Sequence, residues 1–233
     1  MRCLLCLTLA VMIGCEGSER NAAPAAVDED VAREPAVIDP PPTVLMLGTS
    51  LTAGFGLQPE DALPALIQEH VDSAGMPYRV VNAGVSGETS AGALRRLDWL
   101  MRQRFDVLVL ETGANDMLRG MDLDSTRANI QAIIDRVRSE RSGTRIVLVG
   151  MMAPPNLGRD YATRFREMYP TLAVRNDLPL VPFLLAEVGG VAGLNQADGI
   201  HPNEEGTAIV AQNVWEILAP VLRAEAAHLQ TDG

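Results

Sequence analysis

Short apolar runs alternate with amphipathic segments between residues 43 and 222. This alternation is typical of an α/β fold, in which helices cover the faces of a parallel sheet. The apolar runs are rich in leucine and β-branched residues and do not alternate strictly with polar ones, as expected of strands buried on both faces. The strands predicted in this way are residues 44–47, 79–82, 106–111, 145–150 and 180–183.

Segments with the helical spacing of apolar residues fill the gaps between these strands. The expected helices run from Pro59 to Gly75, from a cap at Ser90, from Asp124 or Ser125 onward, over residues 161–175, and from about Asn203 to the end of the domain. We therefore expect one three-layer α/β/α sandwich with a five-stranded parallel sheet over residues 43–222. In the flavodoxin-like strand order 2-1-3-4-5, the first three strands of the chain would be neighbours.

The first residues of the chain predict export. After Met1-Arg2, an apolar run over residues 3–13 is too short to span a bilayer but suits the core of a signal peptide. The run ends in Met12-Ile13-Gly14-Cys15, which resembles a bacterial lipobox. We expect a signal peptide over residues 1–14, lipid attachment at Cys15, and a periplasmic protein anchored to the cell envelope. An ordinary secretory signal cut nearby, or an uncleaved anchor, is the alternative.

Composition and charge narrow the range of partners. The formal net charge is −11, and residues 16–42 are rich in acids, alanine and proline, which predicts a disordered tether. An acidic chain does not favour nucleic acid, and membrane contact would come through the lipid anchor only. All three cysteines precede residue 16, which leaves no cysteine nucleophile or thiolate metal site in the domain. Residues 223–233 are expected to form a polar C-terminal tail.

Four short polar segments are candidates for a common site. Three follow predicted strands, and one precedes the last predicted helix: Gly48-Thr49-Ser50-Leu51-Thr52, Asn82-Ala83-Gly84, Gly113-Ala114-Asn115-Asp116 and Asp198-Gly199-Ile200-His201-Pro202. Ligands in open α/β sheets bind beyond the carboxyl ends of the strands, so we expect these segments to converge there.

The residue types in these segments suit nucleophilic catalysis. A serine hydroxyl such as that of Ser50 needs a base, and histidine serves near neutral pH. His201 is the candidate base, because Asp198 lies three residues before it and could orient the imidazole ring. The other histidines, His70 and His228, fall on a helix and in the polar tail.

Backbone and amide donors complete the expected site. The N–H groups of Ser50 and Gly84 and the side-chain amide of Asn115 could stabilise a negatively charged oxygen. The open alternative is that Gly84 and Asn115 only form turns. Ser86, which lies between glycines, competes with Ser50 as nucleophile, but its glycines do not have the Gly-x-Ser-x-Gly spacing.

Taken together, the four segments resemble the four blocks of SGNH (GDSL-type) hydrolases over residues 44–221. The resemblance is strongest to the periplasmic branch of acyl-CoA thioesterases, lysophospholipases and arylesterases. It implies that Ser50 is the nucleophile, that Gly84 and Asn115 join it in the oxyanion hole, and that Asp198 and His201 complete the triad. It also implies no metal and no organic cofactor. Thr49 stands where the family usually has aspartate, which leaves open how the nucleophile turn is held.

The resemblance also locates a substrate loop after the fourth strand, where Met151, Met152, Pro154 and Asn156 either line an acyl pocket or pack into the core. Residues 187–196 could form the opposite wall. The expected function is hydrolysis of carboxylic esters or thioesters through an acyl-enzyme on Ser50. A carbohydrate O-acetylesterase of the same fold and a non-catalytic envelope-binding lipoprotein are the alternatives, and the sequence does not predict the oligomeric state.

Overall fold

A computed structural model describes residues 40–231 of the chain. The expected signal peptide, the lipidation site at Cys15 and nearly all of the expected tether lie outside this range. Within it, no helix is both long enough and apolar enough to cross a membrane. The same residues contain no group of three side chains that could hold a metal ion.

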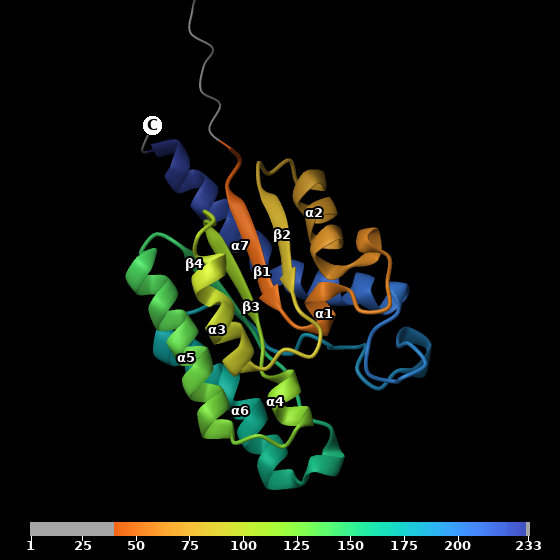
Figure 1. Cartoon of the computed structure of the whole chain (residues 1–233). Helices are drawn as coiled ribbons and strands as arrows, with labels where there is room; N and C mark the ends of the chain where they lie inside the picture. The colour runs from red at the N-terminus through yellow and green to blue at the C-terminus, as the bar shows by residue number, and fades with distance from the viewer. Residues whose placement is uncertain (1–39, 232–233) are drawn as a thin grey trace, which may run out of the picture. The chain divides into compact units, whose positions relative to one another are not determined.

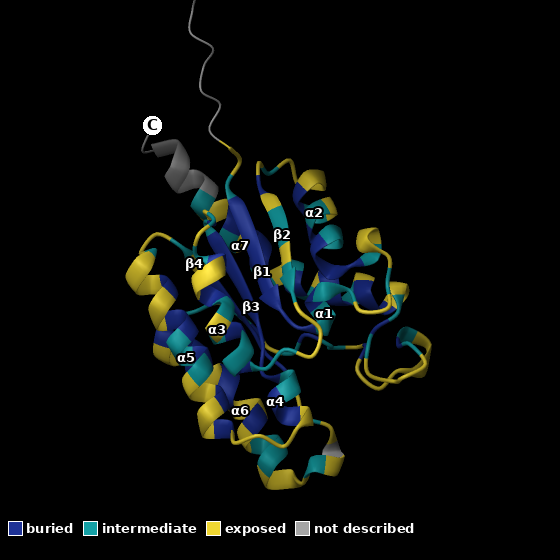
Figure 2. Cartoon of the chain, viewed as in Figure 1, coloured by how far each residue is buried: buried dark blue, intermediate teal, exposed yellow. Residues whose placement is uncertain are grey.

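Five parallel strands form one sheet in the order β2-β1-β3-β4-β5 (Figure 1). The strands are β1 (Thr43–Gly48), β2 (Arg79–Gly84), β3 (Val107–Glu111), β4 (Arg145–Val149) and β5 (Leu180–Val181). Every residue of β1 and β3 is buried, as the apolar runs predict, whereas β2 at the edge is only partly covered (Figure 2). The expected three-layer fold and strand order are confirmed.

Seven α-helices connect and cover the strands of this part of the chain. They are α1 (Ser50–Ala53), α2 (Leu63–Ser73), α3 (Ser90–Leu100), α4 (Ala114–Leu118), α5 (Leu123–Glu140), α6 (Arg159–Asn176) and α7 (Glu204–Thr231), with short 3₁₀ turns at Pro59–Asp61, Pro155–Leu157 and Ala192–Leu194. Helix α2 packs on α7, and α3 and α6 both pack on α5. Figure 1 shows α3 and α5 in front of the strands and α7 behind them.

Several helix boundaries differ from the sequence prediction for local reasons. Asp122 caps α5, because its side chain accepts the Ser125 N–H, so the helix begins before Asp124. Thr89 caps α3 in place of Ser90. The helix expected from Pro59 is a 3₁₀ turn there, and α2 begins after the extended residue Ala62.

Two short helices were not predicted, and both carry expected site residues. Helix α1 follows β1 and begins at Ser50, while α4 follows β3 and contains Asn115. Strand β5 ends at Val181, two residues earlier than expected. Helix α7 continues to Thr231, so much of the expected C-terminal tail is helical.

Candidate active site

Ser50, His201 and Asp198 are linked by hydrogen bonds at the carboxyl edge of the sheet. His201 Nε2 lies 2.9 Å from Ser50 Oγ, and His201 Nδ1 lies 2.6 Å from Asp198 Oδ2. A neutral imidazole that donates from Nδ1 to the carboxylate has its acceptor lone pair at Nε2. The ring is therefore placed to accept the proton of the Ser50 hydroxyl.

The loop before α7 fixes the carboxylate of Asp198. Its Oδ1 accepts the backbone N–H groups of Ile200 at 2.9 Å and His201 at 3.0 Å, while Oδ2 serves the imidazole. The side-chain hydrogen bond with His201, together with the two backbone N–H groups, lowers the pKa of Asp198 to about 2. Asp198 is thus ionised at any pH at which imidazole can act as a base.

Two residues that the sequence did not single out support His201. The Phe55 ring lies 4.6 Å from the imidazole, centroid to centroid. Gln196 ties the loop to the turn after α1, because its side-chain N–H groups donate to the carbonyls of Phe55 at 2.7 Å and Pro202 at 2.9 Å. Neither residue belongs to a recognisable motif, so only the structure reveals these contacts.

A buried carboxylate lies beneath the turn that carries Ser50. Glu111, the last residue of β3, is only 2% exposed. Its Oε2 accepts the Thr49 N–H at 2.7 Å and the Thr52 hydroxyl at 3.0 Å, and its Oε1 accepts the Thr49 hydroxyl at 2.9 Å. Burial raises the pKa of Glu111, and these hydrogen bonds lower it in part.

These contacts show how the turn is held without the aspartate usual in the family. Thr49 is 1% exposed, and both its N–H and its hydroxyl donate to Glu111. A carboxylate at position 49 would instead face the Glu111 carboxylate at close range, and two such charges repel. Threonine therefore supplies a donor where the family residue would bring a second charge.

The structure does not place Gly84 where the sequence analysis expected it. The Gly84 N–H donates to the Asn82 side chain at 2.9 Å, and Gly84 does not border the cavity next to Ser50. A Cβ atom at position 84 would lie 2.2 Å from the backbone nitrogen of Ala53, which explains the need for glycine. Close packing of β2 against α1 thus accounts for the residue.

Gly87, three residues further along the chain, borders the cavity next to Ser50 instead. It occupies a turn with φ +78°, a conformation that favours glycine, and it borders the same cavity as Ser50 and Asn115. Its N–H makes no hydrogen bond within the described residues, whereas its carbonyl accepts from Arg119 at 2.8 Å. The Asn115 amide donates one of its two N–H groups to the Glu88 carbonyl at 3.0 Å.

The cavity in front of Ser50, which we call the acyl pocket, has a volume of about 500 Å³. Met151, Met152 and Pro154 line it together with Phe183 and Leu185, whereas Asn156 does not. Both expectations for the methionines hold in part, because Met151 is 5% exposed and belongs to the core, while Met152 is 41% exposed.

The opposite wall of the acyl pocket comes from the predicted segment and from α4. Gly189 and Gly190 border the pocket, as the sequence suggested for residues 187–196. Leu118 and Ile200, about half exposed, complete an apolar rim.

The remaining candidates do not contact the triad. His70 stacks on Trp215, with ring centroids 5.3 Å apart, between α2 and α7. Ser86 borders the acyl pocket, but the imidazole of His201 is bonded to Ser50. The side chain of His228 lies outside the described residues.

Serine hydrolases are the class of enzyme that this sheet and this chain of hydrogen bonds define. The sequence matches the model of the GDSL-like Lipase/Acylhydrolase family over residues 46–209. It is 41% identical over 181 residues to Esterase TesA of Pseudomonas aeruginosa, covering 77% of this chain and 89% of that protein. It is 36% identical over 181 residues to thioesterase 1/protease 1/lysophospholipase L1 of Escherichia coli K12, covering 77% and 85%.

Solved structures agree with the sequence comparison. The psychrotrophic esterase EstA from Pseudoalteromonas sp., in a structure inhibited by monoethylphosphonate, superposes with a TM-score of 0.73 at 31% identity. The match covers 78% of this chain and 98% of that one. The chain belongs to the GDSL-like lipase/acylhydrolase family, as its motifs suggested, and it is an ester-hydrolysing enzyme. The alternative of a non-catalytic lipoprotein is set aside.

Thr49→Val tests the hydrogen bonds beneath the nucleophile turn. The Thr49 hydroxyl stabilises the ionised form of Glu111, so its loss costs most when Glu111 is charged. Burial raises the pKa of Glu111, so the folded state is favoured while Glu111 is protonated, and this part of the folding stability is lost as the pH rises through the raised pKa. We expect the free energy of unfolding in urea to fall by roughly 1.5–3 kcal/mol at pH 8 and by less near pH 5.

Thr171→Val is the matched control, since the exposed Thr171 hydroxyl donates only to a helix carbonyl, that of Glu167. Thr49→Ser keeps the donor and should retain most of the stability. A loss in Thr49→Val that is equal at both pH values would contradict a charged Glu111 acceptor.

Asp198→Asn tests the orientation of His201. Both oxygens of Asp198 accept hydrogen bonds, whereas an asparagine amide has only one acceptor oxygen and cannot serve both the backbone N–H groups and His201 Nδ1. We therefore expect kcat/KM to fall roughly 10²- to 10⁴-fold, as in other triads. With its pKa lowered from 3.8 to about 2, Asp198 contributes stability above pH 3.8 that is lost as the pH falls through about 2. The difference in Tm between wild type and variant should therefore persist from pH 8 to pH 5.

Asp160→Asn, in the exposed first turn of α6, is the control. A Tm difference between wild type and Asp198→Asn that closes between pH 8 and pH 5 would contradict the assignment.

Proposed function

We propose that Ser50, His201 and Asp198 act as a catalytic triad on carboxylic esters and thioesters. Ser50 Oγ attacks the acyl carbon while His201 Nε2 takes its proton. His201 then gives this proton to the departing alcohol or thiol, leaving an acyl-enzyme. Water, deprotonated by the same nitrogen, releases the acid and restores Ser50. The observation that carries this proposal is the continuous chain from Ser50 Oγ to Asp198 Oδ2.

Three donors border the place where the negative oxygen would form. Ser50 is the first residue of α1, and its N–H has no acceptor within the helix. Gly87 and Asn115 line the same pocket, and the Gly87 N–H and the second N–H of the Asn115 amide are the other two proposed donors. In this proposal Gly87 takes the place that the sequence analysis gave to Gly84, and the oxyanion hole consists of Ser50, Gly87 and Asn115.

The acyl pocket favours acyl groups longer than acetate. Its lining is mostly aliphatic, aromatic or methionine side chains, including Met151, Met152, Phe183 and Leu185. Such a surface stabilises each buried methylene group by about 0.8 kcal/mol, whereas a carbohydrate O-acetylesterase needs a polar cleft for its sugar. Relatives named as an esterase and as a thioesterase/lysophospholipase point to the same substrate classes.

The expected location of the enzyme follows from its first residues. The apolar run and the lipobox-like segment ending at Cys15 support an exported, periplasmic enzyme held to the cell envelope through a lipid. Residues 16–42 would then separate the catalytic domain from the membrane surface.

Covalent labelling tests the nucleophile. A fluorophosphonate probe should label the wild-type chain once and should not label Ser50→Ala, because phosphonylation needs the hydroxyl activated by His201. Intact-protein mass spectrometry measures the added mass. Ser86→Ala is the matched control and should be labelled like the wild type. Labelling that survives in Ser50→Ala but is lost in Ser86→Ala would move the nucleophile to Ser86.

Acyl-chain length tests the substrate class. We expect kcat/KM for p-nitrophenyl esters to rise from acetate to octanoate, because the added methylene groups are buried in the acyl pocket. Met152→Asp should lower the octanoate-to-acetate ratio roughly fourfold, the effect of about one buried methylene group. Val174→Asp, which alters an exposed valine of α6 outside the pocket, is the control. A steep fall from acetate to octanoate in the wild type would favour the acetylesterase instead.

A further inference from the structure

A second cleft lies on the other side of the Ser86-Gly87 turn from the acyl pocket. It has a volume of about 460 Å³, and Ser86 and Gly87 border both spaces. Three arginines line it: Arg95 and Arg96 from α3, and Arg119 from the end of α4. We call it the basic cleft. The only acidic residue lining it is Glu88.

The charges of the basic cleft are only partly compensated. Arg96 forms a bidentate ion pair with Glu88, at 2.7 Å from both Nε and Nη2, and also donates to the Ala83 carbonyl. Arg95 is exposed and makes no ion pair within residues 40–231. Two guanidinium charges therefore remain in the cleft of a chain whose net charge is −11.

Arg119 is held at the boundary between the two cavities. One of its N–H groups donates to the Gly87 carbonyl at 2.8 Å, and Nη2 would lie 3.7 Å from a Cβ atom at position 87. A guanidinium has five N–H donors, so most of them remain available for a ligand. Because this hydrogen bond already restrains Arg119 in part, less conformational entropy is lost when an anion binds.

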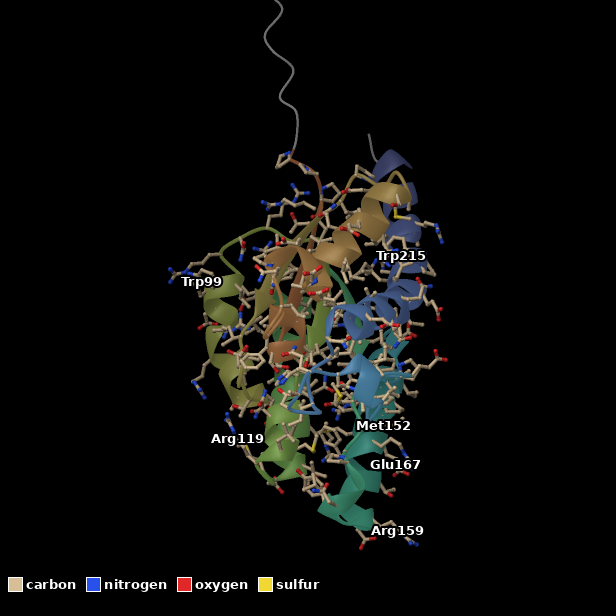
Figure 3. The ribbon with its side chains drawn as sticks, turned by 90° about the vertical axis from the view of Figure 1, so that its right-hand side faces the viewer. Trp99, Arg119, Met152, Arg159, Glu167 and Trp215 are labelled. Atoms are coloured by element: carbon tan, nitrogen blue, oxygen red, sulfur yellow. The ribbon has the colours of Figure 1, made fainter. Side chains whose placement is uncertain are left out.

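We propose that the basic cleft binds a phosphate group on the leaving group of the substrate, through Arg95 and Arg119. The inference rests on the proposed esterase and thioesterase function. The acyl chain would lie along the Met152 wall and the alcohol or thiol part on the Arg119 side. In Figure 3, Arg119 lies at the left edge of the molecule and Met152 to its right. Guanidinium groups match phosphate oxygens in pairs, and phosphate carries the charge needed to satisfy two of them.

Matched substrates separate this inference from the proposed function. Decanoyl-coenzyme A is compared with decanoyl-N-acetylcysteamine, which has the same thioester but no phosphate. Similarly, 1-decanoylglycerol 3-phosphate is compared with 1-decanoylglycerol. In the glycerol pair the ratio of kcat/KM values reports recognition of phosphate alone, and in the thioester pair it reports recognition of the phosphate-bearing remainder of coenzyme A. Hydrolysis of the neutral member reports the esterase or thioesterase activity alone.

Substitutions at Arg95 should lower that ratio. An exposed charge-assisted contact predicts a loss of roughly fivefold for Arg95→Ala, a larger loss for Arg95→Glu, and partial rescue in Arg95→Lys. Arg102→Ala, which removes an exposed arginine just after the other end of α3, should leave the ratio unchanged. Arg119 is unsuitable as the main test, because it also holds the Gly87 carbonyl. Added salt should reduce the wild-type preference by screening the two charges.

Each outcome decides the inference. A fall in the ratio for Arg95→Ala supports it, and the substrate pair in which it occurs identifies a coenzyme A thioester or a glycerophosphate ester as the source of the phosphate. A wild-type ratio of one in both pairs, or a ratio that Arg95→Ala leaves unchanged, overturns the phosphate site while the esterase function stands. A wild type that hydrolyses no member of either pair overturns both.

Discussion

The buried carboxylate of Glu111 holds the turn that carries Ser50, the proposed nucleophile. A carboxylate in the interior must have hydrogen-bond donors, and the three that Glu111 finds all come from Thr49 and Thr52, on either side of Ser50. Glu111 itself is fixed, because it belongs to the central strand β3, which pairs with β1 as far as Leu110 and with β4 as far as Glu111. Movement of the turn that carries Ser50 would therefore leave a buried carboxyl group without partners.

A second buried acid, Asp116, holds the segments that carry Gly87 and Asn115, the proposed oxyanion donors. Asp116 is 1% exposed and accepts the N–H of Ser90 at 2.8 Å and its hydroxyl at 2.5 Å, which joins α4 to the start of α3. Asn115 precedes it, and the Gly87 turn leads into α3. The segments that carry Ser50, Gly87 and Asn115 are thus held through buried acids, whereas His201 depends on an exposed loop held by Asp198 and Gln196.

The sequence predicts the parts of the site that depend on strand order, and it misses those that depend on side-chain contacts. Buried apolar strands give the sheet, and the sheet brings Ser50 and Asn115 together. A glycine after a strand can either offer its N–H to an oxyanion or allow a close approach of the backbone. The sequence does not distinguish these roles for Gly84, and only the packing of Ala53 against it shows that the second applies. The role of Thr49 was equally hidden, since its partner Glu111 is 62 residues away and reads as the polar end of an apolar strand.

Gly87 connects chemistry with leaving-group recognition in the proposed arrangement. It borders both the acyl pocket and the basic cleft, and its carbonyl accepts a hydrogen bond from Arg119. The orientation of the turn that offers the Gly87 N–H therefore depends on the same guanidinium that would contact a phosphate. A phosphate that neutralises Arg119 also restrains it, so the binding energy of the leaving group can improve the alignment of the oxyanion donor. Binding energy remote from the reacting carbon raises kcat when it improves the orientation of groups at that carbon. The Ser86-Gly87 turn, which borders both cavities, connects the phosphate site to the oxyanion donor in this way.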